Sequence, residues 1–216
     1  MNRNFSRGFT MIELLLVIAV IVVLASIAYP TFIGIQERAR ATKDMNNLRQ
    51  IGIATQLYLN DNDGALFSTA TSWMSQLHQT KYLSSWNVFQ SPFDTRAPSE
   101  LGTVATPISY GINGTANFIG TSVDKISQPT IFILFAPAQA STATVTFQGT
   151  AVTGLPGVTV LQATSAPGGA ALGGTHSSRK KVNALFADLH LENMEWSVFT
   201  NTPAGSDPSV AQRWTP

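Results

Sequence analysis

Two small sets of residues in this chain could carry chemistry, one near each end. Near the N-terminus, Glu13 stands directly before residues 14–36, which contain no charged side chain. A carboxylate in a membrane costs about 2.5–3.5 kcal/mol on insertion scales and is expected to have a partner. Near the C-terminus, His176 and Asp188 are placed so that a β-hairpin would bring them face to face. Such a pair can move a proton or form a structural hydrogen bond.

The C-terminal pair does not by itself make an active site. A hydrolase also needs a nucleophile and an orienting group in the same pocket. The sequence contains no P-loop, no dinucleotide-binding glycine pattern and no HExxH zinc motif. It also contains no cysteine, which excludes disulfides, thiolate zinc sites and cysteine nucleophiles. We therefore expect no enzymatic activity, no catalytic residue, and a hydrogen bond between His176 and Asp188 at a sheet edge.

Calcium is a metal ion that the acidic residues near the C-terminus could bind, because their carboxylates are available oxygen ligands. The weak candidate ligands are Asp188, Glu192, Glu195 and Asp207. Their spacing does not form a recognised calcium loop. The sequence therefore predicts no cofactor, with calcium as an alternative.

Composition excludes two further classes of protein. The chain of 216 residues has 13 Lys and Arg against 12 Asp and Glu, and a formal net charge of +1. This balance argues against a basic protein that binds nucleic acid. Hydrophobic residues make up 44% of the chain, which is enough for one ordinary core and excludes a disordered chain. The uncharged residues 14–36 would span about 35 Å as a helix, enough to cross a membrane of about 30 Å.

The N-terminal segment has three interpretations. It can be a signal peptide cut after Ala28, a permanent anchor, or a segment cut at its polar edge with the apolar part retained. Helical spacing continues past Ala28, through Ala41, Met45, Leu48, Ile51 and Tyr58, with Ile53 and Leu57 widening the stripe. We therefore predict one helix over residues 9–60, with residues 9–36 in a membrane or a filament core. Pro30 and Gly34 predict a kink or a melted stretch near residues 26–34.

The rest of the chain predicts a small globular domain over residues 61–216. Residues 60–64 read as a helix stop with a turn, and residues 71–83 as a short helix whose apolar side chains lie in the core: Trp73, Met74, Leu77 and Leu83. Residues 84–125 are expected to be mainly loop. Strands are expected at residues 130–135, 143–148, 158–162, 182–187 and 190–198. The predicted fold class is α+β, with one long helix packed on a small antiparallel sheet.

One motif near the N-terminus resembles a known family. Its residues are Arg7-Gly8-Phe9-Thr10-Met11-Ile12-Glu13, followed by the apolar run and by Pro30. The motif is similar to the signal of type IV pilins and type II secretion pseudopilins. In that family, a prepilin peptidase cuts after the glycine and methylates the new N-terminus. The resemblance implies a leader at residues 1–8, cleavage after Gly8, an N-methylated Phe9, and pairing of Glu13 with the α-amino group of a neighbouring subunit.

The C-terminal part is similar to pseudopilin-like proteins of planctomycete and verrucomicrobial type. The likeness rests on residues 50–58, Ser91-Pro92-Phe93-Asp94, Ser109-Tyr110-Gly111-Ile112-Asn113, and the stretch from His176 to His190. The chain departs from that family's histidine-spacer-Asp-Gly motif, because Leu189 follows Asp188 where the family has glycine.

Together these resemblances imply a structural subunit of a type IV pilus-like filament. We favour a type II secretion major pseudopilin, with a surface pilin as the alternative. The implied partners are other copies of the chain, prepilin peptidase, an inner-membrane assembly platform and, before assembly, membrane lipid; nucleic acid is not expected. The precursor would cross the inner membrane once, and the filament would be periplasmic or extracellular. A soluble binding module released after Ala28 is the rival from another class.

Overall fold

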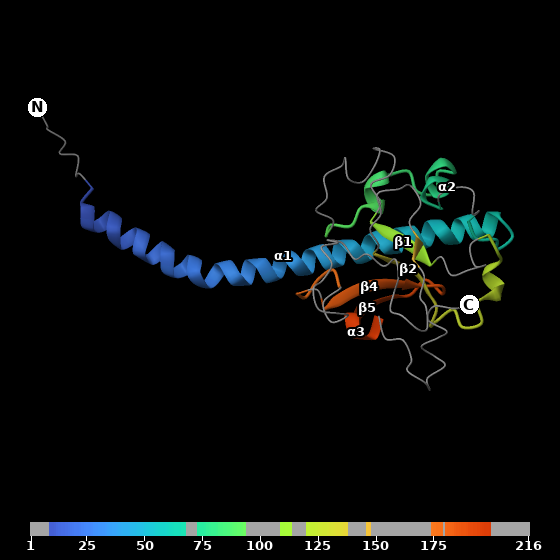
Figure 1. The fold of residues 1–216 in the computed structure, drawn as a ribbon. Coiled ribbons are helices and arrows are strands. Elements are labelled where there is room, and N and C mark those ends of the chain that lie inside the picture. The colour runs from blue at the N-terminus through green and yellow to red at the C-terminus, as the bar shows by residue number, and fades with distance from the viewer. Residues whose placement is uncertain are drawn as a thin grey trace, which may run out of the picture. The chain divides into compact units, whose positions relative to one another are not determined.

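The computed structural model describes residues 9–67, 73–93, 109–113, 120–137, 146–147, 174–178 and 180–199. The chain divides into two compact units, Met1–Ala39 and Arg40–Pro216. Helix α1, Met11–Asp61, contributes its first part to one unit and its second part to the other (Figure 1). The helix begins at Met11 and not at Phe9, because Thr10 caps it.

In the first unit, α1 stays helical through residues 26–34, so the predicted melted stretch is wrong. Pro30 lies inside the helix and has no N–H to donate. Hydroxyl groups nearby bond to carbonyls of the preceding turn: Ser26 Oγ donates to the oxygen of Val23 at 2.7 Å and Thr31 Oγ1 to that of Ile27 at 3.2 Å. The kink at Pro30 and Gly34 stays a prediction.

In the second unit, one face of α1 is buried. Its buried residues are Asp44, Asn47, Leu48, Ile51, Gly52, Ala54, Thr55, Tyr58 and Leu59. The predicted stripe is confirmed at Leu48, Ile51 and Tyr58. The widening by Ile53 and Leu57 is wrong, since these side chains are 54% and 46% exposed. Two residues turn an α-helix by about 200°, which places Ile53 opposite Ile51.

The helix ends in the predicted turn. The backbone N–H of Gly64 donates to the oxygen of Leu59 at 2.8 Å, and Gly64 has a φ of +75°. A glycine adopts this left-handed conformation without steric cost, which ends the helix and turns the chain back toward the core.

Five strands form one sheet in the order β3-β1-β2-β4-β5. Their bounds are Tyr110–Asn113 for β1, Ile133–Pro137 for β2, Thr146–Phe147 for β3, Lys181–Phe186 for β4 and Leu191–Glu195 for β5. All neighbouring pairs are antiparallel except β1 with β3. The predicted α+β fold is confirmed.

The strand predictions agree with β2, β3, β4 and β5, although β5 ends at Glu195, where α3, Trp196–Phe199, begins. Strand β1 falls in the stretch expected to be loop, so that part of the prediction is wrong. With only four residues, β1 is too short to show clear alternation in the sequence. The strand expected at residues 158–162 lies outside the described residues.

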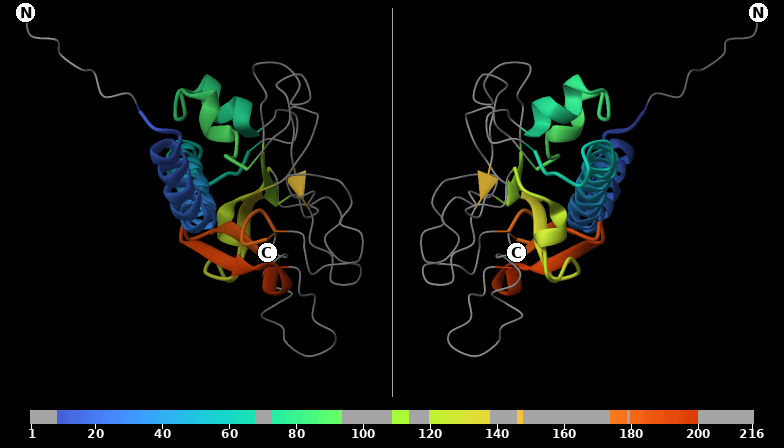
Figure 2. Two further views of the ribbon diagram at one scale, coloured as in Figure 1. Left: turned by 90° about the vertical axis from the view of Figure 1, so that its left-hand side faces the viewer. Right: turned by 90° about the vertical axis from the view of Figure 1, so that its right-hand side faces the viewer.

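The sheet buries both faces. On the face toward α1, Leu48 and Ile51 of the helix pack in one core with β1, β2 and Leu185 of β4. The same core includes α2, Trp73–Gln79, and the 3₁₀ helix Trp86–Phe89. The four core residues predicted for the short helix are all buried. On the other face, Val182, Ala184 and Phe186 pack with Met194 and with α3. Figure 2 shows α2 and α3 on opposite sides of the strands. A second 3₁₀ helix spans Val123–Lys125.

Candidate functional site

Glu13 forms a capping box with Thr10 at the start of α1. Its Oε2 accepts from the backbone N–H of Thr10 at 2.9 Å and from Thr10 Oγ1 at 2.8 Å. In return, Thr10 Oγ1 lies 3.3 Å from the backbone N–H of Glu13 and accepts from it. These bonds satisfy N–H groups that a helix start leaves without intrahelical partners. Both bonds to the carboxylate use Oε2, and Oε1 has no hydrogen-bond partner among the described residues.

The helix behind Glu13 exposes its apolar side chains on every face. Leu15, Leu16 and Leu24 are 63%, 66% and 63% exposed, and no part of the most apolar stretch of α1 is buried. By length and composition this helix is able to cross a membrane. A surface this apolar is stable in water only when something covers it.

The other residues predicted at this end are placed as follows. Gly8 lies outside the described residues. Phe9 precedes the helix and is 74% exposed. A Cβ added at Gly34 would meet no heavy atom within 4 Å.

The predicted hydrogen bond between His176 and Asp188 is wrong. Asp188 lies in the turn between β4 and β5, where its Oδ1 contacts Nδ1 of His190 at 2.5 Å and accepts from the backbone N–H of His190 at 3.1 Å. His176 instead contacts Asn193 through Nε2 at 2.6 Å and Thr175 through Nδ1 at 2.9 Å. The tight turn directs the side chain of Asp188 toward His190, two residues along the chain, and the spacing between His176 and Asp188 does not reveal this.

The three candidate calcium ligands that the structure describes do not come together. Asp188 pairs with His190 in the turn, whereas Glu195 lies at the far end of the hairpin, 3.3 Å from Lys181 Nζ. Glu192 is exposed on β5, and Asp207 lies outside the described residues. Within the described part of the chain, no group of three or more acidic or histidine side chains is arranged to hold a metal ion.

A buried polar network surrounds Asp44 of α1 and was not predicted from the sequence. One carboxylate oxygen, Oδ1, accepts from Ser91 Oγ at 2.5 Å and from the Tyr110 hydroxyl at 2.7 Å. The other, Oδ2, accepts from Asn183 Nδ2 at 2.9 Å. Asn47 Nδ2 donates to the Tyr110 hydroxyl at 3.3 Å and to the carbonyl oxygen of Gln90 at 3.0 Å. The network joins α1 to β1, to β4 and to the segment after Phe89.

Burial dominates the electrostatics of this network. It raises the pKa of Asp44 above the ordinary 3.8, although the bonds from Ser91, Tyr110 and Asn183 oppose the rise. Burial, followed by the nearby Asp44 charge, raises the pKa of Tyr110 well above its usual 10.0. Tyr110 is therefore protonated at neutral pH and donates its hydroxyl hydrogen to Asp44.

A signal for this network was present in the sequence. Asp44 stands four residues before Leu48 and seven before Ile51, on the apolar face of the helix. A charged residue on such a face must be paired when it is buried. Ser91 and Tyr110 lie in two of the segments that carry the C-terminal resemblance, but their convergence on Asp44 required the structure.

Comparison with known proteins identifies the class of the N-terminal segment. Residues 3–29 match the family model of the prokaryotic N-terminal methylation motif. This match contains Gly8, Phe9 and Glu13, and with the apolar helix it fits a membrane-anchored precursor.

The chain is similar to two curated proteins of that kind. It is 40% identical over 58 residues to the type IV major pilin protein PilA of Myxococcus xanthus, covering 27% of this chain and 26% of that protein. It is 32% identical over 62 residues to the type II secretion system core protein G of Klebsiella michiganensis, covering 29% of this chain and 44% of that protein. The resemblance to type IV pilins and type II secretion pseudopilins is confirmed.

The matched stretches span less than half of either relative. No solved structure matches the chain significantly. The likeness of the C-terminal part to planctomycete and verrucomicrobial proteins stays a prediction.

Proposed function

We propose that this protein is a non-enzymatic structural subunit of a type IV pilus-like filament. In this proposal, prepilin peptidase removes residues 1–8 and methylates Phe9. Residues 9–36 first lie in the inner membrane and then in the core of a filament built from copies of the chain by an inner-membrane assembly platform. Residues 61–216 form the head, which the second part of α1 carries.

The observation that carries the proposal is the uncovered apolar surface of α1 behind a single carboxylate. Burying one large aliphatic side chain contributes about 1.5–3 kcal/mol, so burying the whole surface contributes on the order of tens of kcal/mol. Lipid and neighbouring helices both provide such burial, which supports a subunit that moves from membrane to filament. An inert anchor would need the apolar surface but not the methylation motif around Gly8.

The geometry of Glu13 supports its assembly role. The capping box with Thr10 survives cleavage after Gly8, because it uses only atoms of Thr10 and Glu13. Oε1 remains available for a charge-assisted bond to the α-amino group of another subunit. Before cleavage that nitrogen belongs to a neutral amide, so processing creates the partner.

Within this class we favour a type II secretion major pseudopilin, because the C-terminal resemblance points to pseudopilin-like proteins. A surface pilin is the alternative, and the two curated relatives represent both kinds. Shearing native cells and imaging the released material separates them. A surface pilin is recovered in the sheared fraction, whereas a pseudopilin stays with the cell envelope.

The first test is the intact mass and N-terminal sequence of the protein from its native cells. A chain that begins at methylated Phe9 supports the proposal, and the variant Gly8→Val should block this processing. A chain that begins at Tyr29 would instead mean that signal peptidase cuts after Ala28, and this result would refute the filament proposal.

The second test separates the charge of Glu13 from its capping role. Glu13→Gln can keep the capping box, since Gln also serves at that position, but it has no charge. Glu13→Ala removes both. We expect both variants to be processed at Gly8 and to yield at least about tenfold fewer filaments, as a lost charged contact of about 1.4 kcal/mol implies. Glu37→Ala, on the same helix beyond the apolar run, is the matched control. Normal filaments from Glu13→Gln would refute the charge pairing.

A further inference from the structure

The polar network continues from Asp44 through two amides to His176. Asn183 Nδ2 lies 2.9 Å from Asp44 Oδ2 and 3.1 Å from the carbonyl oxygen of Ala41. Both partners are acceptors, so the NH₂ group of Asn183 must face α1. Its amide oxygen, Oδ1, therefore points the other way, toward β5.

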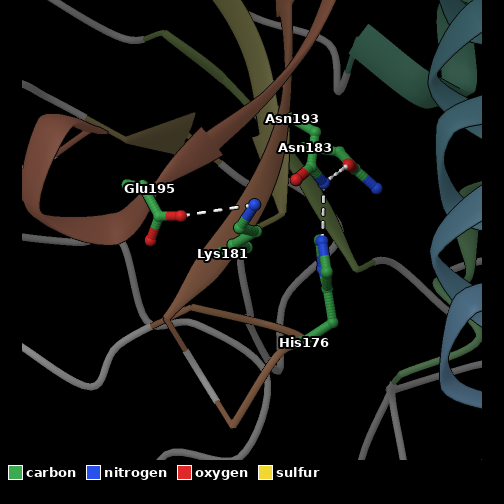
Figure 3. Close-up of polar contacts among 5 residues, drawn as sticks. All are labelled: His176, Lys181, Asn183, Asn193 and Glu195. Carbon is green, nitrogen blue, oxygen red and sulfur yellow. Dashed lines mark hydrogen bonds and ion pairs between the residues drawn. The ribbon is translucent and has the colours of Figure 1, made fainter. Parts of the chain in front are cut away.

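This orientation determines the next two residues in turn. Asn183 Oδ1 accepts from Asn193 Nδ2 at 2.6 Å, across the register pair that joins β4 to β5. The same nitrogen of Asn193 lies 2.6 Å from His176 Nε2. Figure 3 marks both contacts of this nitrogen with dashed lines. With Asn193 as the donor, Nε2 of His176 must accept. The imidazole is then neutral, and its proton is on Nδ1, beside Thr175 Oγ1 at 2.9 Å.

We propose that this chain of hydrogen bonds is a pH-sensitive lock that holds α1 to the β4–β5 hairpin. With His176 neutral, the bonds run without conflict from Nε2 through Asn193 and Asn183 to Asp44. Protonation places an N–H on Nε2 against the NH₂ group of Asn193. Asn193 then leaves His176, and the end of the chain at β5 opens.

Reorienting the amides does not relieve this conflict. Turning Asn193 over would place its oxygen against Oδ1 of Asn183. Turning Asn183 over would in turn place its oxygen against the Asp44 carboxylate and the Ala41 carbonyl. Asn193 is exposed to solvent whereas Asn183 is fully buried, so Asn193 is the member that moves.

Charged and titratable groups around His176 act on the lock from several elements. Asp44 on α1 attracts a charged imidazole through space, which opposes the effect of the hydrogen-bond direction. Tyr110 on β1 stays neutral. Lys181 on β4 and Glu195 on β5 pair with each other at 3.3 Å (Figure 3). The ring of Phe93 stacks on the imidazole with 5.5 Å between centroids. At 2.6 Å the conflict between two donors outweighs the attraction by Asp44.

The other two histidines make their hydrogen bonds outside this network. Nδ1 of His190 contacts Asp188 Oδ1 at 2.5 Å in the turn between β4 and β5. Nδ1 of His78 donates to the carbonyl oxygen of Leu83 at 3.0 Å. Substituting these residues therefore provides matched controls.

The test is thermal unfolding of the full chain in detergent micelles at pH 7.5 and pH 5.0. The variant His176→Gln retains an acceptor oxygen near the position of Nε2 but does not titrate. We expect the wild type to lose at least about 3 °C of Tm relative to His176→Gln on going from pH 7.5 to pH 5.0, which is a measurable shift for a domain of this size. Asp44 is present in both proteins, so the effect of its burial, which acts in the opposite direction, is common to both.

The controls His190→Gln and His78→Gln should keep the acid-induced loss of the wild type. Nitrogen-15 NMR of the histidine rings at pH 7.5 provides an independent readout and should show His176 with its proton on Nδ1. Parallel Tm profiles for the wild type and His176→Gln, or a proton on Nε2 at pH 7.5, would overturn the proposal. Neither readout depends on filament formation, so failure of the lock and failure of the proposed function are distinguishable.

Discussion

Replacing Asp44 by alanine tests whether the buried network holds α1 to the head. The substitution removes the shared acceptor of three buried donors, on Ser91, Tyr110 and Asn183, although Asn183 still donates to the carbonyl oxygen of Ala41. An unsatisfied buried donor costs about 1–3 kcal/mol. Removing the carboxylate also removes the cost of burying its charge, so the net loss is smaller than the summed cost of the unsatisfied donors. We expect a loss of about 3–5 kcal/mol in the free energy of unfolding, toward the lower end of the roughly 3–9 kcal/mol that three fully unsatisfied donors would cost.

The assay is urea unfolding of the full chain in detergent micelles, followed by tryptophan fluorescence. Trp73 is a suitable reporter because its ring packs on Phe89 at 5.5 Å and on Phe135 at 4.8 Å, in the core that faces α1. A loss of 3–5 kcal/mol corresponds to a fall in Tm of about 6–20 °C. Glu192→Ala, an exposed acidic residue on β5, is the control and should change stability by less than about 0.5 kcal/mol. A loss from Asp44→Ala no larger than that of the control would refute the reasoning.

Two further predictions concern the contacts of α1 with the sheet. Because the folded pKa of Asp44 is raised above 3.8, the stability that this group contributes is complete below that value and is lost as pH rises through the folded pKa. Urea titrations at a series of pH values should therefore show that the stability of the wild type relative to Asp44→Asn declines from about pH 4 upward. A stability difference that stays constant with pH would contradict the raised pKa. Gly52→Val should cost about 1–3 kcal/mol by overpacking, since even a Cβ there lies 3.0 Å from Leu185 Cδ2, whereas Gly34→Ala, with open space around it, should not destabilise the head in the same titration.

The first half of the protein was predictable because its signals are local. An uncharged apolar run, a glycine and a glutamate at fixed spacing, and a helical stripe each depend only on neighbouring residues. The same holds for the turn at Gly64, where the residues 60–64 are themselves the turn. Errors occurred where period or length was ambiguous. Ile53 and Leu57 are apolar but lie off the buried face, and β1 is a strand of only four residues.

The candidate functional residues also divide into those that depend on local sequence and those that depend on the tertiary structure. The positions of Gly8, Phe9 and Glu13 relative to the apolar run are properties of the sequence, and the family model matches them. The capping box between Thr10 and Glu13 spans four residues, so it too is a local arrangement. The partner of His176 is different, because a turn of a few residues decided that Asp188 contacts His190.

By itself, the sequence determined the apolar helix, the methylation motif and the α+β class, because periodicity and spacing along the chain are enough for each of them. Only the tertiary structure decided what surrounds Asp44. Its three donors come from residues 47, 66 and 139 positions away in the chain. Such contacts exist only after the helix has packed on the sheet and the burial of apolar residues has offset the entropy of closing those loops. No local pattern records that a carboxylate on an apolar face will meet a serine, a tyrosine and an asparagine.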